Sequence, residues 1–230
     1  MEDSFNKCFE LLRAGDVEAL RQLLVQDPAY AGARDSSGVS LLMQCLYRGH
    51  RDLVELIASK RTASKKIADK NKALDIFEAA ALGHLDRLKE IIRDDSVRDP
   101  SLVNSHSRDG FTALHLACFF AQPEAARLLI EAGAEVDAVA ANPTRVMPLH
   151  SAASARNLEA ARFLLEHGAP VNARQQAGWV PIHAAAQNGD RAMVELLLKY
   201  HADPKLTNDN GKTAAMVARE KGHEQIAALL

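Results

Sequence analysis

Long apolar runs are missing from this chain of 230 residues. No hydrophobic stretch approaches the roughly 20 residues that a helix needs to cross a bilayer. The opening segment, MEDSFNKCFELLRAGD, carries acids where a secretory signal peptide needs bases, and its apolar residues fall at helical spacing. The sequence therefore predicts a cytoplasmic protein that does not bind a membrane.

Cysteine is also scarce. The three cysteines, Cys8, Cys45 and Cys118, are far apart in the sequence and form no CxxC pair. A disulfide framework and a zinc ribbon both need closely spaced cysteines in larger number. We expect these three to be small apolar residues in a reducing compartment.

The chain also lacks an excess of charge of one sign. It has 28 Lys and Arg against 30 Asp and Glu, divided 16 to 17 over residues 1–100 and 12 to 13 over residues 101–230. This balance argues against a protein built around nucleic acid or an acidic membrane surface. With 47% hydrophobic residues, the chain is long enough to bury a sizeable core.

What the sequence does contain is a repeat. Seven segments align, with spacings of 34, 34, 38, 35, 33 and 33 residues, on Phe9, Met43, Phe77, His115, His150, His183 and Met216. Each segment reads as a turn, a short Ala-rich helix, a second turn and a Leu-rich helix. Neither helix can bury its apolar face alone, so the units must stack as a solenoid. We predict a single domain over residues 1–230, with copies one to seven at about 1–34, 35–68, 69–106, 107–140, 141–174, 175–207 and 208–230.

Three of these copies carry a recognisable motif. The segments Gly110–Ala117 (GFTALHLA), Met147–Ala152 (MPLHSA) and Pro181–Ala185 (PIHAA) resemble the Thr-Pro-Leu-His-x-Ala signature of ankyrin repeats. Together with LDIFEAAALG in copy three, the run is similar to stand-alone bacterial ankyrin-repeat proteins. The resemblance implies an all-α-dominated ankyrin-repeat solenoid of about seven helix-turn-helix units joined by short finger loops.

The motif histidines raise the question of a metal site. Stacked helices lie roughly 8–10 Å apart, whereas Zn–N bonds are about 2.0–2.1 Å. One histidine per repeat therefore cannot converge on a single ion, and we expect no metal site. The ankyrin resemblance implies instead that His115, His150 and His183 are structural, each tying a turn to its own helix and to the neighbouring repeat.

The residues at the ends of the helices allow local predictions. Thr112 and Thr213 are expected to cap the N-termini of the first helices of their copies, whereas Met147 and Val180 at the matching positions cannot. His201 replaces the Gly that follows the Leu-rich helix in copies four and five. Because this position usually needs a positive φ, we predict a left-handed conformation for His201.

The resemblance also implies where function lies, because ankyrin repeats bind partner proteins on a concave face of fingers and first helices. The positions expected to line this face are Val39, Tyr47, Arg48, Ala73, Ala81, Leu82, Phe111, Phe119, Phe120, Val146, Ser154, Ala155, Trp179, Gln187, Asn188, Lys212, Glu220 and Lys221. Five of the eleven aromatic residues fall in this set. Aromatic residues are favoured at binding hot spots, so the sequence predicts an exposed aromatic site.

We predict one hot spot built from Phe111, Phe119, Phe120 and Trp179. Its expected edge is formed by Arg108, Gln187 and Asn188. Further residues expected to bind a partner are Tyr47, Arg48, Arg145, Val146 and Lys212. Arg145 stands where Gly is usual, in a finger two residues longer than its neighbours. The alternative for Phe119 or Phe120 is packing under a neighbouring helix, since Ala121 and Pro123 disturb that turn.

The leading hypothesis is thus a non-catalytic, monomeric protein–protein interaction module with an unidentified protein partner and no cofactor. The alternative is a small-molecule or nucleic-acid binder that uses the aromatic site or a basic finger over residues 60–72. That segment holds six Lys and Arg and a single acid, Asp69. An enzyme is the third hypothesis, but the sequence offers no nucleophile–base pair or ligand cluster on which to base one.

Overall fold

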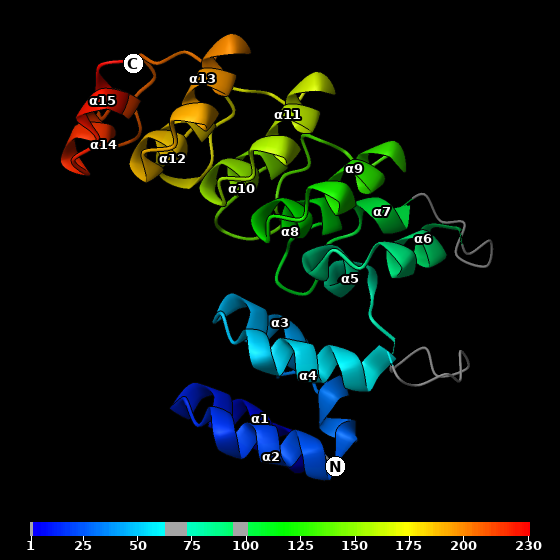
Figure 1. Cartoon of the computed structure of the whole chain (residues 1–230). Helices are drawn as coiled ribbons and strands as arrows, with labels where there is room; N and C mark the ends of the chain where they lie inside the picture. The colour runs from blue at the N-terminus through cyan, green and yellow to red at the C-terminus, as the bar shows by residue number, and fades with distance from the viewer. Residues whose placement is uncertain (1, 63–72, 94–100) are drawn as a thin grey trace. The chain divides into compact units, whose positions relative to one another are not determined.

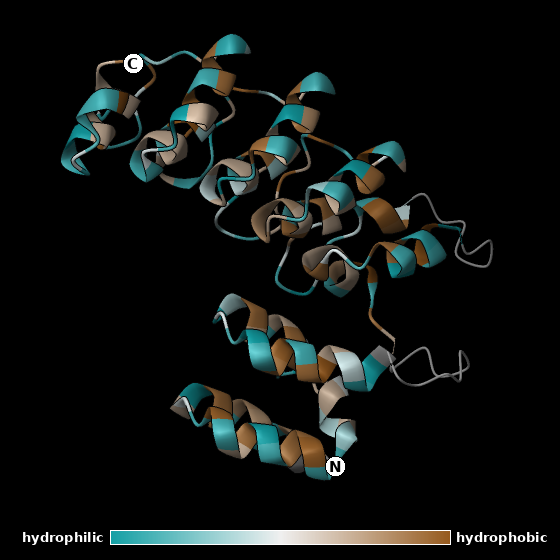
Figure 2. Cartoon of the chain, viewed as in Figure 1, coloured by the Kyte–Doolittle hydropathy of each residue, from teal (hydrophilic) through white to brown (hydrophobic). Residues whose placement is uncertain are grey.

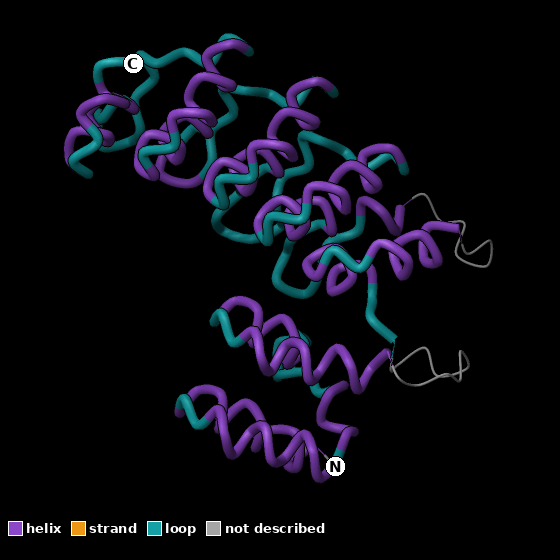
Figure 3. Tube along the Cα trace, viewed as in Figure 1, coloured by secondary structure: helices purple, strands orange, loops and turns teal. Residues whose placement is uncertain are grey.

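The computed structural model describes residues 2–62, 73–93 and 101–230, and in this part the chain is built from helices joined by turns (Figure 3). It divides into two compact units, unit 1 from Met1 to Glu78 and unit 2 from Ala79 to Leu230. Each unit is described by itself. A single domain over the whole chain stays a prediction.

Unit 1 contains the first two helix pairs. In chain order its elements are α1 (Glu2–Ala14), α2 (Val17–Gln26), the 3-10 helix η1 (Pro28–Gly32), α3 (Leu41–Tyr47) and α4 (Arg51–Thr62). Helix α1 packs against α2 and α3, and α4 packs against α2 and α3. Copies one and two therefore stack first helix on first helix and second on second.

Unit 2 begins within α5 and contains the remaining pairs. Its elements are α5 (Ile76–Leu82), α6 (Leu85–Arg93), α7 (Ser101–Asn104), α8 (Ala113–Phe119), α9 (Pro123–Glu131), α10 (Pro148–Ser154), α11 (Leu158–Glu166), η3 (Gln176–Gly178), α12 (Pro181–Asn188), α13 (Arg191–Lys199), α14 (Ala214–Glu220) and α15 (Glu224–Ala227). Each predicted copy thus supplies one pair of helices in the described part of the chain, and copy three also contains the short helix α7.

The helices of unit 2 form two rows, which Figure 1 shows. The first helices α8, α10, α12 and α14 pack on one another in chain order, and α9, α11 and α13 form a second row beside them. The first helices α8, α10, α12 and α14 also each pack against the second helix of their own copy. This two-row stack is the predicted solenoid, and the fold-class prediction is confirmed.

The core of the stack follows from residue size. The first helices bury small residues such as Ala117 and Ala152, and the second helices bury leucines such as Leu129, Leu164 and Leu197. Alanine lets two backbones approach closely, and leucine fills the space between copies. The helices in Figure 2 accordingly carry hydrophobic residues on part of their surface and hydrophilic residues on the rest.

The helix ends follow the capping rules. The Asp16, Asn157 and Asp190 side chains each accept a backbone N–H at the start of a second helix, at 3.0–3.1 Å. Glycine ends several first helices, as at Gly189 with φ +66°. A side chain at such a position is strained, and His201 takes this conformation with φ +66°, as predicted.

The two long connectors that precede copies two and four have similar structures. The first contains η1 and a bridge between Arg34 and Ser40, and the second contains α7 and a bridge between His106 and Thr112. The bridge closes a finger hairpin directly before the first helix in each case. The connectors therefore position the fingers, on which the candidate site depends.

Candidate protein-binding surface

The finger loops are shaped by polar side chains at their bases. In copy two, the Asp35 carboxylate accepts the N–H groups of Ser37 and Val39, both at 3.0 Å. In copy seven, the Asn208 amide oxygen accepts those of Asn210 and Lys212, at 3.0 and 3.1 Å. A short polar side chain that bonds to the backbone two residues later specifies a tight turn, so the sequence itself fixes these fingers.

The motif histidines connect each finger to its helix and to the next repeat. The His115 Nδ1 accepts the Thr112 N–H at 3.3 Å and the Thr112 hydroxyl at 2.7 Å, and its Nε2 donates to the Val146 carbonyl at 3.0 Å. The acceptor role of Nδ1 places the ring proton on Nε2. Burial lowers the pKa of His115 to about 4, so the neutral ring is the stable form.

His150 and His183 repeat this arrangement. Their Nδ1 atoms accept the N–H groups of Met147 and Val180, both at 3.2 Å, and their Nε2 atoms donate at 3.0 Å to the Ala173 and Lys212 carbonyls. Burial lowers the pKa of both rings, to about 4 for His150. The three rings thus bond to three different carbonyls. No group of three or more metal-ligating side chains that could hold an ion occurs among the described residues.

The N-caps differ between copies as the sequence predicts. The Thr112 and Thr213 hydroxyls accept the N–H groups of His115 and Met216, both at 3.4 Å. Met147 and Val180 make no side-chain capping bond. Pro148 and Pro181 instead begin these two helices, because proline has no N–H to leave unpaired there.

We call the fingers and first helices of copies four to six (residues 105–122, 139–157 and 174–189) the finger face. At its finger end, Phe111, Val146 and Trp179 occupy matching positions in successive copies, and all three are half-buried. The Phe111 ring lies 6.0 Å from the His115 ring, and the Trp179 ring lies 5.5 Å from that of His183. These three residues form an apolar stripe along the finger bases.

Phe119 and Phe120 lie at the C-terminal end of α8, whereas Phe111 lies in the finger before its N-terminus. Their rings meet edge to face at 5.2 Å, and Phe119 is 47% exposed whereas Phe120 is half-buried. Among the described residues, no ring contact joins this pair to Phe111 or Trp179. The hot spot predicted as one cluster is therefore divided into a finger-end stripe and a Phe119–Phe120 pair.

Several residues predicted to bind a partner have structural bonds. The Asn188 amide donates to the Ala153 and Ser154 carbonyls, at 3.3 and 3.1 Å, which ties its turn to the preceding copy. The Lys212 ammonium pairs with Glu220 at 2.7 Å. The Arg48 guanidinium donates to the Gln44 side chain at 2.8 Å.

Other predicted positions vary in exposure. Tyr47 is 38% exposed, and the Gln187 and Arg108 side chains are exposed. Val39 and Ala81, however, are buried in the core, so their expected place on a binding face is wrong. The aligned position alone could not show this, because neighbouring elements cover these small side chains.

Two arginines in copy five have left-handed backbones. Arg145 has φ +50° and Arg156 has φ +58°. The first lies in the finger, where copies two, four and seven place Gly38, Gly110 and Gly211 at φ of +72° to +86°. The left-handed region costs a side chain about 1–2 kcal/mol. The sequence comparison identified Arg145 but missed Arg156, which replaces the Gly found between the two helices of copies one, two, three, six and seven.

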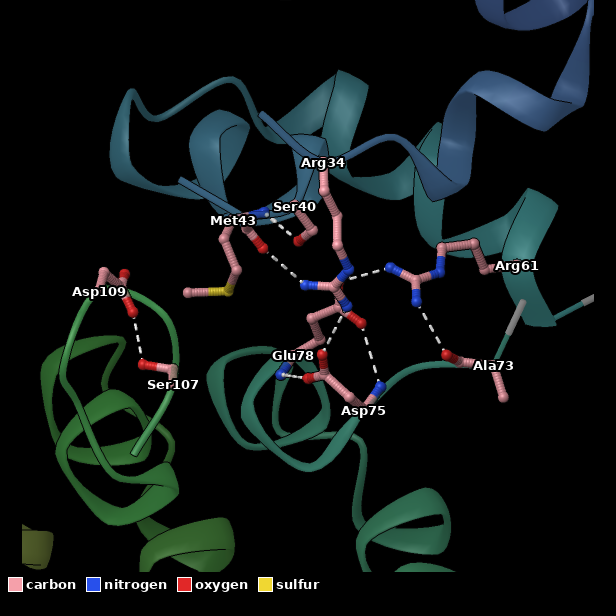
Figure 4. Close-up of polar contacts among 10 residues, drawn as sticks. Arg34, Ser40, Met43, Arg61, Ala73, Asp75, Glu78, Ser107 and Asp109 are labelled. Atoms are coloured by element: carbon pink, nitrogen blue, oxygen red, sulfur yellow. Dashed lines mark hydrogen bonds and ion pairs between the residues drawn. The ribbon is translucent and has the colours of Figure 1, made fainter. Parts of the chain in front are cut away.

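A buried ion pair lies at the end of unit 1 (Figure 4). Arg61 bonds through one nitrogen to the Glu78 carboxylate at 2.5 Å and through the other to the Ala73 carbonyl at 2.8 Å. Glu78 also accepts the Asp75 N–H at 3.0 Å, and Asp75 accepts the Glu78 N–H at 2.9 Å. Arg34 pairs with Asp75 at 2.9 Å. This network joins α4 to the start of α5.

The network changes the interpretation of the basic segment at residues 60–72. Residues 60–62 belong to α4 rather than to a finger, and the Arg61 side chain is only 4% exposed. Arg61 therefore cannot contact a phosphate backbone, and this part of the prediction is wrong. Residues 63–72 lie outside the described residues.

Cysteine chemistry does not contribute to the surface. Cys8, Cys45 and Cys118 are free and buried, and burial raises the pKa of the Cys8 thiol to about 11 and that of Cys45 to about 12. A thiol protonated at neutral pH is a poor nucleophile.

Across residues 2–62, 73–93 and 101–230, every helix is too short or too polar to reach across a bilayer.

Comparisons with known proteins agree with this geometry. Two family models match, one described as ankyrin repeats (3 copies) over residues 76–175 and one as ankyrin repeats (many copies) over residues 164–218. Together they cover more than half of the chain.

Similar proteins include B-cell lymphoma 3 protein of Homo sapiens, 40% identical over 119 residues, which are 52% of this chain and 26% of that protein. Ankyrin repeat and SOCS box protein 3 of Bos taurus is 35% identical over 162 residues, 70% of this chain and 30% of its own length. The tyrosine-protein kinase HTK16 of Hydra vulgaris is 32% identical over 118 residues, 50% of this chain and 15% of the kinase.

The chain thus spans less than one third of the length of these relatives. All three are animal proteins, so the resemblance to bacterial proteins stays a prediction. The family models, the two-row stack and the His-anchored fingers together show that the chain belongs to the ankyrin repeat family.

Proposed function

We propose that this protein is a non-catalytic interaction module that holds a partner protein on its finger face. Ankyrin repeats generally serve as protein-interaction modules, which supports the proposal. The single observation that carries it is the exposure of Phe119, a large aromatic side chain that is 47% accessible. A ring of this size usually lies inside a protein, because burial stabilises it by roughly 1.5–3 kcal/mol.

The finger-end stripe adds a second apolar contact area. Phe111, Val146 and Trp179 are half-buried, so their positions are fixed by the fold while part of each side chain remains accessible. A side chain already held in place loses little conformational entropy when a partner binds. The stripe and the Phe119–Phe120 pair can therefore both act as preorganised contact areas.

The test is capture of partners from the native cell by a tagged chain, followed by mass spectrometry. Phe119→Ala and Trp179→Ala should each weaken capture, by about 2 kcal/mol if the residue is a hot spot. Val25→Ala is the matched control, because Val25 is a 58% exposed apolar residue on α2 of unit 1 and is not one of the residues of the finger face.

Circular dichroism must show unchanged helix content in all three variants. If Phe119→Ala and Trp179→Ala retain every partner that the unmodified chain captures, the finger face is not the binding surface. Loss of capture in Val25→Ala to the same degree would also contradict the assignment, since the effect would then not depend on position.

A further inference from the structure

The finger face carries charge of almost one sign, although the chain as a whole has a formal charge of −2. Its three segments hold a single acid, Asp109, whose carboxylate accepts the Ser107 hydroxyl. The cations in the same segments are Arg108, Arg145, Arg156 and Arg174. By contrast, acids such as Glu159 and Glu195 lie on the second-row helices α11 and α13.

None of the four arginines forms an ion pair with another described residue. Arg156 donates to the Asn188 carbonyl at 2.6 Å, and Arg174 donates to the Gly178 carbonyl at 3.3 Å. Both acceptors are uncharged. The Asp209 carboxylate lies near the Arg174 guanidinium beside Gly178, whereas Arg108, Arg145 and Arg156 have no ion-pair partner within the described part of the chain.

Two of these arginines are present at a cost to stability. Arg145 and Arg156 hold left-handed backbones that glycine would adopt without strain, and glycine occupies the matching positions in other copies. Ala121 and Ala177 on the same face are also left-handed, so the strain alone does not identify a contact; at Arg145 and Arg156 it accompanies an exposed guanidinium. Both lie in copy five, one before and one after α10.

The cations also flank an apolar surface. Arg145 directly precedes Val146, which lies at the centre of the apolar stripe between Phe111 and Trp179. A ligand that contacts the stripe must therefore come close to an uncompensated guanidinium. Guanidinium groups form their strongest hydrogen bonds with carboxylates and phosphates.

From this arrangement we propose that the finger face of copies four to six binds an acidic segment of a partner protein. Its carboxylates would pair with Arg145, Arg156 and Arg108, and one of its large apolar side chains would contact the stripe. The inference rests on the proposed function, because it requires the finger face to be a protein-docking surface. A protein segment is favoured over a nucleic acid because the chain as a whole has a formal charge of −2 and because ankyrin repeats generally serve as protein-interaction modules.

The chain carries its own reporter for a direct test. Trp179 is the only tryptophan and lies in the stripe, so its fluorescence, excited where tyrosine does not absorb, reports contact there. The probe is the random copolymer poly(Glu,Tyr), which combines carboxylates with aromatic rings. The comparison probes are poly(Lys,Tyr) and a single-stranded oligonucleotide.

We expect saturable binding of poly(Glu,Tyr) that weakens as salt is added, because salt screens exposed charges. Poly(Lys,Tyr) should not bind, and the oligonucleotide should bind more weakly than poly(Glu,Tyr). Arg145→Gly and Arg156→Gly should each lower the affinity about fivefold, as expected for an exposed ion pair. Their melting temperatures should be unchanged or higher, because glycine removes the strain.

His201→Gly is the matched control. It removes the same backbone strain at φ +66° but lies at the end of α13, outside the finger face, so it should bind as tightly as the unmodified chain. Arg162→Gln, which removes an exposed charge from the second-row helix α11, should likewise have no effect on affinity.

Three outcomes would overturn the inference: no binding of poly(Glu,Tyr), full affinity in the variant that combines Arg145→Gly with Arg156→Gly, or tighter binding of the oligonucleotide. The proposed function is tested separately by the capture experiment with Phe119→Ala and Trp179→Ala. If those variants lose a partner while poly(Glu,Tyr) fails to bind, the docking surface stands and only its preference for an acidic segment is wrong.

Discussion

Replacing Glu78 by alanine should destabilise unit 1 strongly. The change removes the carboxylate that faces Arg61, whose side chain is only 4% exposed. Breaking a buried ion pair in this way costs about 3–5 kcal/mol, because one charge stays desolvated and uncompensated. The Asp75 N–H also loses its acceptor at the start of α5, which adds about 1 kcal/mol.

The loss is measurable by urea unfolding followed by circular dichroism. With a typical dependence of about 2 kcal/mol per molar urea, the midpoint should fall by roughly 2–3 M. Trp179 lies in unit 2, so its fluorescence reports on unit 2 alone, whereas circular dichroism reports on the helices of both units. A loss confined to unit 1 should therefore separate the two signals.

Two further variants test the physical reason. The double change Arg61→Met with Glu78→Leu should recover most of the lost stability, since an apolar pair needs no desolvation of charge. Arg191→Ala is the control, because the Arg191–Glu195 pair, with side chains 66% and 51% exposed, should contribute at most about 1 kcal/mol. If Glu78→Ala costs no more than Arg191→Ala, the pair does not stabilise the fold as we reason.

Two other predictions concern the first helices. Met147→Thr and Val180→Thr should each raise the stability by about 1 kcal/mol, because the new hydroxyl can cap its helix as Thr112 does; a melting temperature unchanged or lower in both would contradict the alignment. Acid should destabilise the chain, since the folded pKa of His150, about 4, lies below the ordinary value of about 6.5, so the unfolded state takes up protons first. The stability that His150 contributes above a pH of about 6.5 should be lost towards a pH of about 4, by up to about 3 kcal/mol, and urea midpoints should show a smaller loss in His150→Gln.

The sequence alone predicted the repeat, the helix pairs and the roles of single positions. The Thr112 and Thr213 caps, the left-handed His201 and the Nδ1 bonds of the histidines depend on residues within a few positions of one another. Because equivalent positions recur in each copy, the sequence indicates the same local preference several times. The stacking of copies followed because neither helix of a unit can bury its apolar face by itself.

The tertiary structure decided what depends on neighbouring copies. It separated Phe119 and Phe120 from Trp179, buried Val39 and Ala81, and used the Asn188 amide to hold a turn of the preceding copy. These outcomes depend on which side chains of adjacent units cover or bond to one another, and the alignment of one unit on another carries no such information.

The Arg61–Glu78 pair shows the physical reason most clearly. The two residues are 17 positions apart in the sequence. Residue type alone predicts that both side chains are exposed, because Arg and Glu are rarely buried. Only the packing of α4 beside the start of α5 excludes water from both side chains and brings the two charges into contact. Local backbone preferences are therefore encoded within each repeat, whereas the burial and pairing of charged side chains are decided only when repeats pack together.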